Sequence, residues 1–344
     1  MRTPIRSRGE QAGRPHSELD RASRLGRRLS ERLAHPAQVV SSVLLRLLRN
    51  PTSALGLLLL FCFTLVALLA PILAPPEPDR SPYDMPQSQI MRPFQPPAGE
   101  DSYMPTPSPP SPDHILGTSQ DQYDIFYGLV WGTRTAFRLG ILVIFSTLLI
   151  GITVGAVSAY AGGWVDELIQ RGVEIFLVFP FLVTTMVLTA ILGKGINNII
   201  LAFIIFGWAF YARLIRGEVL HVKENNYVEA ARAIGASGRH IIMRHLLPNA
   251  VYPVLVLASL DIGSIVLAAA ALSFLGLGTP GYADWGGMIN MARSWIIQSH
   301  GETLAYWYTF VYPGVAITLF VLGWNLLGDA VRDISDPRLR RGRG

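Results

Sequence analysis

The sequence predicts an all-α membrane protein with six transmembrane helices and a short helix in a cytoplasmic loop. Half of the 344 residues are hydrophobic and only 15% are charged, whereas a soluble domain carries roughly a quarter charged residues. The apolar residues gather in six long runs, and about 20 apolar residues are needed for a helix to cross the hydrocarbon of a bilayer. Helices are required there because lipid offers no partner to an unpaired backbone N–H or C=O group.

The six runs define the predicted spans. In order, they are Ala54–Leu73, Phe137–Tyr160, Val173–Leu192, Ile199–Ile215, Ala250–Leu272 and Thr309–Leu327. The first begins more than fifty residues into the chain, whereas the apolar core of a secretion signal lies within roughly the first 15–30 residues. We therefore expect the first run to be a retained anchor. A short interfacial helix is also expected at about 286–298.

Arginine and lysine residues orient the predicted spans. The segment up to Asn50 holds eleven arginines, and the loops at 161–172 and 216–249 and the C-terminal segment add more. The flanks on the opposite side carry fewer. Because cytoplasmic flanks of membrane proteins are enriched in these residues, both termini are predicted to be cytoplasmic.

Composition divides the chain into five predicted regions. A stretch from Pro71 to Pro112 holds 14 of the 24 prolines, and this density excludes helix interiors and central strands. We expect an extended outer linker there, either a spacer or a docking surface. The regions are an Arg-rich cytoplasmic tail (1–50), a first transmembrane helix (51–74), a Pro-rich periplasmic loop (75–133), a core of five transmembrane helices (134–330) and a basic cytoplasmic tail (331–344).

The loop at 217–249 carries the most informative pattern. Asn226 can cap a helix with Glu229 reaching back to its backbone amide, Gly235 suits the left-handed residue that ends it, and Ser237 can cap a second helix. The spacing i, i+3, i+4, i+7 places four residues on one face: Tyr227, Ala230, Ala231 and Ile234. The two alanines make this face shallow. Such a helix is either a rigid element that transmits force from a soluble partner or an ordinary amphipathic loop helix.

Several sequence blocks resemble one family. Glu229-Ala230-Ala231, Gly235 and Leu247-Pro248 are similar to the EAA loop of bacterial ATP-binding cassette (ABC) importer permeases. Further blocks resemble the dipeptide, oligopeptide and nickel branch of that family, and specifically the "C" member of its permease pair. These blocks are Gly162–Asp166, Tyr211–Arg213 with Arg216-Gly217, Arg244–Asn249, Leu272–Gly278, Asp284–Gly286, Asn325–Asp329 and Asp336–Arg340.

The resemblance implies a non-catalytic subunit of an ATP-driven importer in the bacterial inner membrane. A second permease chain would complete a heterodimer, two ATP-binding subunits would hold ATP and magnesium, and a periplasmic or lipid-anchored solute-binding protein would deliver cargo. This chain would contact lipid, bind no cofactor and no nucleic acid, and touch the ATPases through Tyr227, Glu229, Ala230, Ala231, Ile234 and Gly235. The cargo stays open among dipeptides, oligopeptides, nickel chelates and related solutes.

The chain departs from the family pattern at two places that bear on function. The segment Gly117–Asp124 lacks an Asp and an Arg that relatives commonly carry, which puts in doubt any contact those residues make on the outer face. Relatives often carry Glu where Ala269 stands, and the acid of this span is instead Asp261.

Asp261 lies near the middle of the fifth predicted span, where a carboxylate costs several kcal/mol unless it is paired or hydrated. It either faces the solute path or is a structural acid between packed helices. A rival interpretation of the whole chain is a proton-coupled secondary transporter that titrates Asp261, and another is a membrane scaffold without transport.

Other chemistry finds no support in the sequence. No phosphate-binding loop of the Gly-x-x-x-x-Gly-Lys-Ser/Thr type occurs, and the seven histidines show no metal-ligand spacing. Cys62 is the single cysteine, so a disulfide within the chain and a cysteine metal site are both excluded.

Overall fold

A computed structural model describes residues 50–87, 106–297 and 305–335. The chain divides into two compact units, residues 1–51 and 52–344, and everything below concerns the second unit and helix α3, which begins at Pro51. The tail predicted for 1–50, most of the tail predicted for 331–344 and part of the Pro-rich segment lie outside the described residues.

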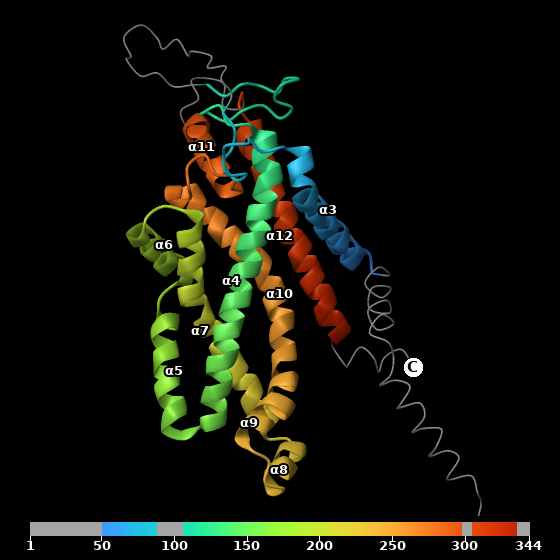
Figure 1. Cartoon of the computed structure of the whole chain (residues 1–344), viewed down its shortest axis with the longest axis vertical. Helices are drawn as coiled ribbons and strands as arrows, with labels where there is room; N and C mark the ends of the chain where they lie inside the picture. Colours follow the sequence, from blue (N-terminus) through green and yellow to red (C-terminus); the bar gives the residue numbers. More distant parts are fainter. Residues whose placement is uncertain (1–49, 88–105, 298–304, 336–344) are drawn as a thin grey trace, which may run out of the picture. The chain divides into compact units, whose positions relative to one another are not determined.

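The regular elements of the described residues are all helices, and extended pairing among these residues is limited to three isolated bridges. Figure 1 shows the helices in chain order. Their bounds are α3 (Pro51–Leu73), α4 (Ile125–Ala161), α5 (Gly163–Val178), α6 (Phe181–Leu192), α7 (Ile196–Lys223), α8 (Asn226–Ala233), α9 (Gly238–Ile241), η1 (Ile242–Leu246), α10 (Leu247–Leu272), η2 (Ser273–Leu277), α11 (Trp285–Ile297) and α12 (Tyr308–Ser335).

Five of the predicted spans are confirmed as helices long and apolar enough to cross a membrane. They correspond to α3, α4, α7, α12 and the continuous helical run Gly238–Leu277 that contains α10. The short helix expected at about 286–298 is α11. The all-α membrane class is therefore confirmed for the part of the chain that the structure describes.

The third predicted span, Val173–Leu192, is wrong as a single helix. It is divided between α5 and α6, which are bent by 83° with respect to each other. Pro180 has no backbone N–H to continue a helix, and the residue before a proline is driven to extended backbone; Phe179 accordingly has φ −89° and ψ 143°. Most of the expected loop at 161–172 is in fact the first half of α5.

Helix α4 begins at Ile125, inside the region 75–133 that the prolines assigned to a loop. Asp124 starts the helix, because its Oδ1 accepts the Tyr127 N–H at 2.8 Å. The span predicted to begin at Phe137 therefore extends further toward the N-terminus, and α4 includes Arg134. Arg134 is accommodated with its guanidinium 5.1 Å from the centre of the Trp131 ring.

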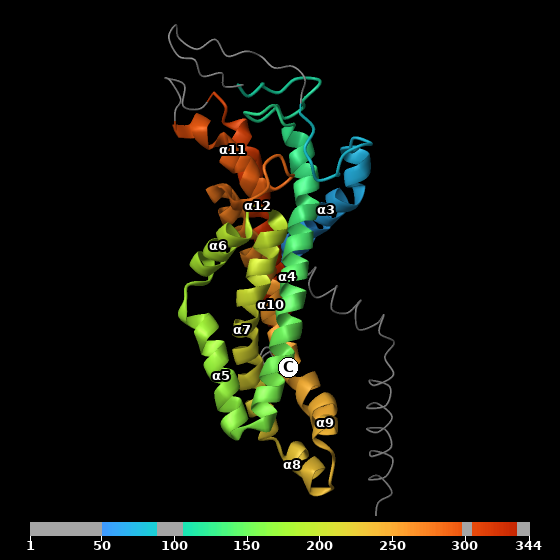
Figure 2. The same ribbon diagram turned by 60° about the vertical axis from the view of Figure 1, so that its left-hand side comes forward.

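A glycine seam joins α4 to α7, which run side by side in Figures 1 and 2. A Cβ atom added at Gly151 would lie 2.6 Å from Tyr211 Cβ, and one at Gly155 would lie 2.4 Å from the Ala212 carbonyl oxygen. Small residues let helix backbones approach closely, which is how helices associate in lipid. The two glycines therefore set the distance between α4 and α7.

We predict that Gly155→Ala destabilises the protein by about 1–3 kcal/mol, because the added methyl group overpacks a contact with backbone atoms that have little freedom to move. Thermal unfolding in detergent measures the effect. Gly172→Ala is the matched control, since a Cβ at this α5 position meets nothing within 4 Å. Equal melting temperatures for the two variants would contradict the close approach at Gly155.

Candidate transport cavity and coupling helix

Helix α8 begins one residue earlier than the capping pattern indicated. Asn225 is the N-cap residue, and Asn226 is the first helical residue. The main-chain oxygen of Asn225 accepts the Val228 N–H at 2.9 Å, while its side-chain amide donates to the Val222 carbonyl of α7 at 3.0 Å. The expected capping box through Asn226 and Glu229 is therefore not formed, because the cap residue is one position earlier and its amide turns back onto α7.

The C-terminal end of α8 is as predicted. Gly235 has φ +79°, a left-handed conformation that favours glycine. Its N–H donates to the Arg232 carbonyl at 2.9 Å, and the Ala236 N–H donates to the Ala231 carbonyl at 3.0 Å. This pair of hydrogen bonds is the Schellman motif. Ser237 then caps α9 by accepting the His240 N–H.

Of the four residues predicted to share one face of α8, one is buried against the bundle and three are exposed. Val228 is 0% exposed and Ala231 7% exposed, and both pack in one hydrophobic cluster with residues of α7, α9, η1 and α10. Tyr227 and Ile234 are 44% and 85% exposed, and Ala230 is exposed with them. Ala231 therefore anchors the helix, and a small apolar patch formed by Tyr227, Ala230 and Ile234 faces away from the bundle. Glu229 is exposed as well.

A polar network holds the α4–α5 corner against α7, close to the start of α8. Arg216 donates two hydrogen bonds to Asp166, at 2.7 and 2.6 Å, which is the strong bidentate geometry of this pair. The Ser158 hydroxyl also bonds to Asp166. Lys223 donates to the Ala159 carbonyl of α4 at 2.9 Å. Asp166 and Arg216 belong to separate sequence blocks, and nothing in the sequence indicates that they pair or that Lys223 contacts α4.

Asp261 lies on the wall of an open cavity of about 420 Å³ that is lined by residues of α4, α5, α6, α7 and α10. The Tyr211 hydroxyl donates to its Oδ2 atom at 2.6 Å. Ser264 adds a hydroxyl group to the wall, whereas the hydroxyl of the buried Thr147 donates to backbone carbonyls of its own helix. The described lining residues include no Lys, Arg or His, and five are phenylalanines: Phe176, Phe179, Phe181, Phe206 and Phe210. Three of these rings flank the break between α5 and α6, and the other two come from α7, where Phe206 lies with its ring centre 5.7 Å from that of Phe176.

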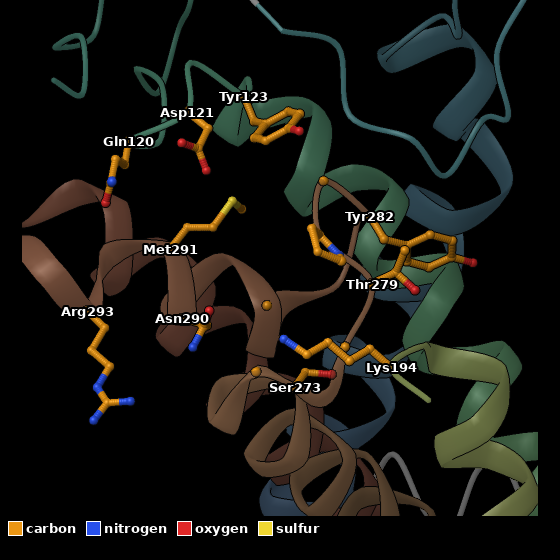
Figure 3. A pocket seen from close by; sticks show the side chains of 15 residues that line it. Gln120, Asp121, Tyr123, Lys194, Ser273, Thr279, Tyr282, Asn290, Met291 and Arg293 are labelled. Atoms are coloured by element: carbon orange, nitrogen blue, oxygen red, sulfur yellow. The ribbon is translucent and has the colours of Figure 1, made fainter. Parts of the chain in front are cut away.

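A second pocket, of about 520 Å³, lies at the opposite end of the bundle from α8 and is shown in Figure 3. Asp121, Lys194 and Asn290 reach it from three separate segments. Burial raises the pKa of the Asp121 carboxyl. The segment Gly117–Asp124, which departs from the family pattern, thus supplies Asp121 to this wall.

Asp284 lies near this second pocket and starts α11. It is buried, and its Oδ2 atom accepts the Gly287 N–H at 3.1 Å. Burial raises the pKa of this carboxyl, and the hydrogen bond from the Gly287 amide offsets part of that rise. Its neutral form is therefore favoured by the fold.

Comparison with known proteins places the chain in a family. Residues 148–341 match the family model "Binding-protein-dependent transport system inner membrane component", and residues 40–97 match the "N-terminal TM domain of oligopeptide transport permease C". The chain belongs to the family of binding-protein-dependent transport system inner membrane components. The resemblance to C-type permeases of ABC importers, first seen in the sequence blocks, is confirmed.

Curated relatives agree with this assignment. The dipeptide transport system permease protein of Alkalihalophilus pseudofirmus is 34% identical over 86% of this chain and 88% of its own length. The glutathione transport system permease protein of Pectobacterium atrosepticum is 39% identical over 67% and 75%, and the probable D,D-dipeptide transport system permease protein of Escherichia coli is 40% identical over 67% and 75%. An inward-facing structure of the MetNI methionine ABC transporter aligns at 20% identity and TM-score 0.49, over 61% of this chain and 97% of the other.

We predict a pH-dependent contribution of Asp284 to stability. A carboxyl whose folded pKa is raised stabilises the protein below its usual value of 3.8 and loses that contribution as the pH rises through the folded pKa. Relative to Asp284→Asn, the wild type should therefore lose melting temperature as the pH rises above the usual carboxyl value of 3.8. The exposed Asp113 gives a control, Asp113→Asn, that should follow the wild type. A difference between wild type and Asp284→Asn that does not vary with pH would contradict the prediction.

Proposed function

We propose that this chain is one permease subunit of an ATP-driven importer for peptides or similar small solutes, and that α8 couples it to the ATPases. The family assignment makes the chain a membrane component of a transport system that depends on a binding protein. Relatives named for dipeptide, glutathione and D,D-dipeptide transport support a peptide-type solute. The observation that carries the coupling role is the exposed apolar patch of α8 on an otherwise firmly anchored helix.

The packing around α8 offers a mechanical route into the membrane. Val228 and Ala231 share one hydrophobic cluster with Leu246 of η1, with Ala250 near the start of α10, and with Ile262 farther along α10. Ile262 is the neighbour of Asp261 in the chain. A displacement of α8 by a bound partner is therefore passed through close-packed side chains to α10, and so to the cavity wall.

The remaining parts of the proposal follow from the same assignment. A second permease chain completes the path as a heterodimer, a periplasmic or lipid-anchored protein delivers the solute, and two ATP-binding subunits hold ATP and magnesium. This chain itself carries out no bond chemistry and contributes movement. A transport system that depends on a binding protein favours this importer over a proton-coupled transporter working through Asp261, and over a scaffold without transport.

We further propose that α8 and both termini face the cytoplasm and that the pocket around Lys194 and Asp121 faces outward. The arginine-rich N-terminal segment supports this orientation. Helices α8 and α11 lie at opposite ends of the bundle in both views (Figures 1 and 2), so one experiment addresses both sides of the membrane.

We expect Ile234→Glu to weaken retention of the ATP-binding subunits about tenfold in a detergent pull-down of the co-expressed complex, because a charge replaces an exposed apolar anchor. Gly235→Pro should also lose them, since proline cannot adopt the φ of +79° and has no N–H for Arg232.

Ile115→Glu is the matched control for Ile234→Glu, because Ile115 is also an exposed isoleucine, 64% exposed, and lies near the other end of the bundle. It should retain the ATPases. Retention by all three variants would show that α8 is not the docking site, and no retention by the wild type would contradict the importer-subunit assignment itself.

The orientation is tested by cysteine labelling in a Cys62→Ala background, which removes the single cysteine. A membrane-impermeant maleimide should label Ile115→Cys in spheroplasts and Arg239→Cys only in inverted membrane vesicles. Both positions are exposed in the subunit. The reverse pattern would overturn the orientation, and labelling of both from one side would mean that α8 and the outer segment share a side.

A further inference from the structure

We infer that the cavity around Asp261 binds the free amino end of the transported solute, with the ammonium group beside the Asp261 carboxylate and an apolar side chain among the phenylalanine rings. This inference rests on the proposed import of peptides, and it assigns this subunit a part in choosing them. A volume of about 420 Å³ is within the range of small-molecule sites, which are mostly apolar and carry a few placed polar groups.

The charge on the cavity wall is of one sign. Asp261 is the one ionisable acid among the described lining residues, and no basic side chain lines the cavity. In the described part of the chain no ion pair involves Asp261, and its one hydrogen bond from another side chain comes from Tyr211. A carboxylate held within a membrane protein needs a counter-charge or water. A cationic solute group would supply that counter-charge while it passes.

The hydrogen-bonding capacity fits an ammonium group. A carboxylate accepts about four hydrogen bonds, and the Tyr211 hydroxyl occupies one of those sites. An ammonium group has three hydrogen-bond donors and no acceptor, so it complements the acceptor sites of the Asp261 carboxylate that Tyr211 does not occupy. The exposed Ser264 hydroxyl can accept a further N–H of a peptide backbone. Tyr211 at the same time fixes the rotamer of Asp261, so that the carboxylate is positioned before the solute arrives.

The five phenylalanine rings make up much of the apolar lining, together with aliphatic residues such as Val143, Ile265 and Ala268. A ring face attracts a cation electrostatically, and the same rings shed water from an apolar side chain. An acetylated amino end would bring an amide in place of the ammonium and leave Asp261 without a counter-charge. The described lining residues include no cation to neutralise the solute's own carboxylate, so that end must meet water or another chain of the complex.

Transport by the complete complex tests the inference. The permease pair, the ATPases and the binding protein are reconstituted in proteoliposomes, and uptake of L-alanyl-L-phenylalanine is compared with that of its N-acetyl form. The quantity measured is the ratio of the two uptake rates. Selection by the binding protein is the same for every permease variant, so it cancels when the ratios of two variants are compared.

We expect Asp261→Asn to lower this ratio at least about tenfold, because the isosteric amide carries no charge to pair with the ammonium. Asp261→Glu should keep the preference for the free amine. Ser259→Ala, on the same helix but outside the cavity lining, should keep the wild-type ratio. If the binding protein admits no acetylated peptide, saturation binding of both probes to the permease–ATPase complex without it gives the same comparison.

Two results would overturn the inference. A ratio in Asp261→Asn within about twofold of the wild type would do so, even if both rates fell together, because that pattern belongs to a structural acid. Loss of preference in Ser259→Ala as well would show that the ratio reports general damage to α10. Failure of the wild-type complex to import any peptide with its binding protein and ATP present would instead refute the proposed function, and so would be distinguished from both.

Discussion

The close contact between α4 and α7 is the constraint on which the other features depend. Gly151 lies where a Cβ atom would strike Tyr211, and Gly155 lies where one would strike the backbone of α7 beside Arg216. The first glycine therefore lets Tyr211 reach Asp261 in the cavity. The second lets Arg216 reach Asp166 at the α4–α5 corner. One helix seam thus positions both the cavity wall and the base from which α8 projects.

The bend between α5 and α6 is the second constraint, and it arises from covalent chemistry. Pro180 removes an N–H and forces Phe179 into extended backbone. Irregular backbone at membrane depth is tolerated where it lines a cavity or is buried in protein, and Phe179 lines the Asp261 cavity. The Pro180 carbonyl still accepts hydrogen bonds from the Thr184 N–H and hydroxyl. The break therefore starts a new helix without leaving that carbonyl unpaired.

The sequence predicted what local chemistry determines. Apolar run length located five spans, and the αL preference of glycine located the end of α8 at Gly235. The prediction of helix ends was wrong where contacts with other side chains matter. In α4 the Arg134 guanidinium lies over the Trp131 ring, and the helix begins well before the predicted apolar run. Pro180, inside the predicted span, is a sequence signal for the α5–α6 break, whereas the length of the apolar run alone indicates one continuous helix. The Tyr211–Asp261 hydrogen bond joins residues fifty positions apart, and no periodicity within a single element encodes it.

The division of α8 into an anchored and an exposed side explains how so short a helix can serve as a mechanical part. A helix of two turns is not stable by itself, because nucleation is costly and few hydrogen bonds follow. Its position is therefore fixed by Val228 and Ala231, which pack into the same cluster as the base of α10. A partner bound to Ile234 would displace α8 only together with that cluster, since a close-packed interior transmits strain. The cluster extends along α10 to Ile262, the neighbour of Asp261 in the chain, so close-packed side chains connect α8 with the wall of the Asp261 cavity.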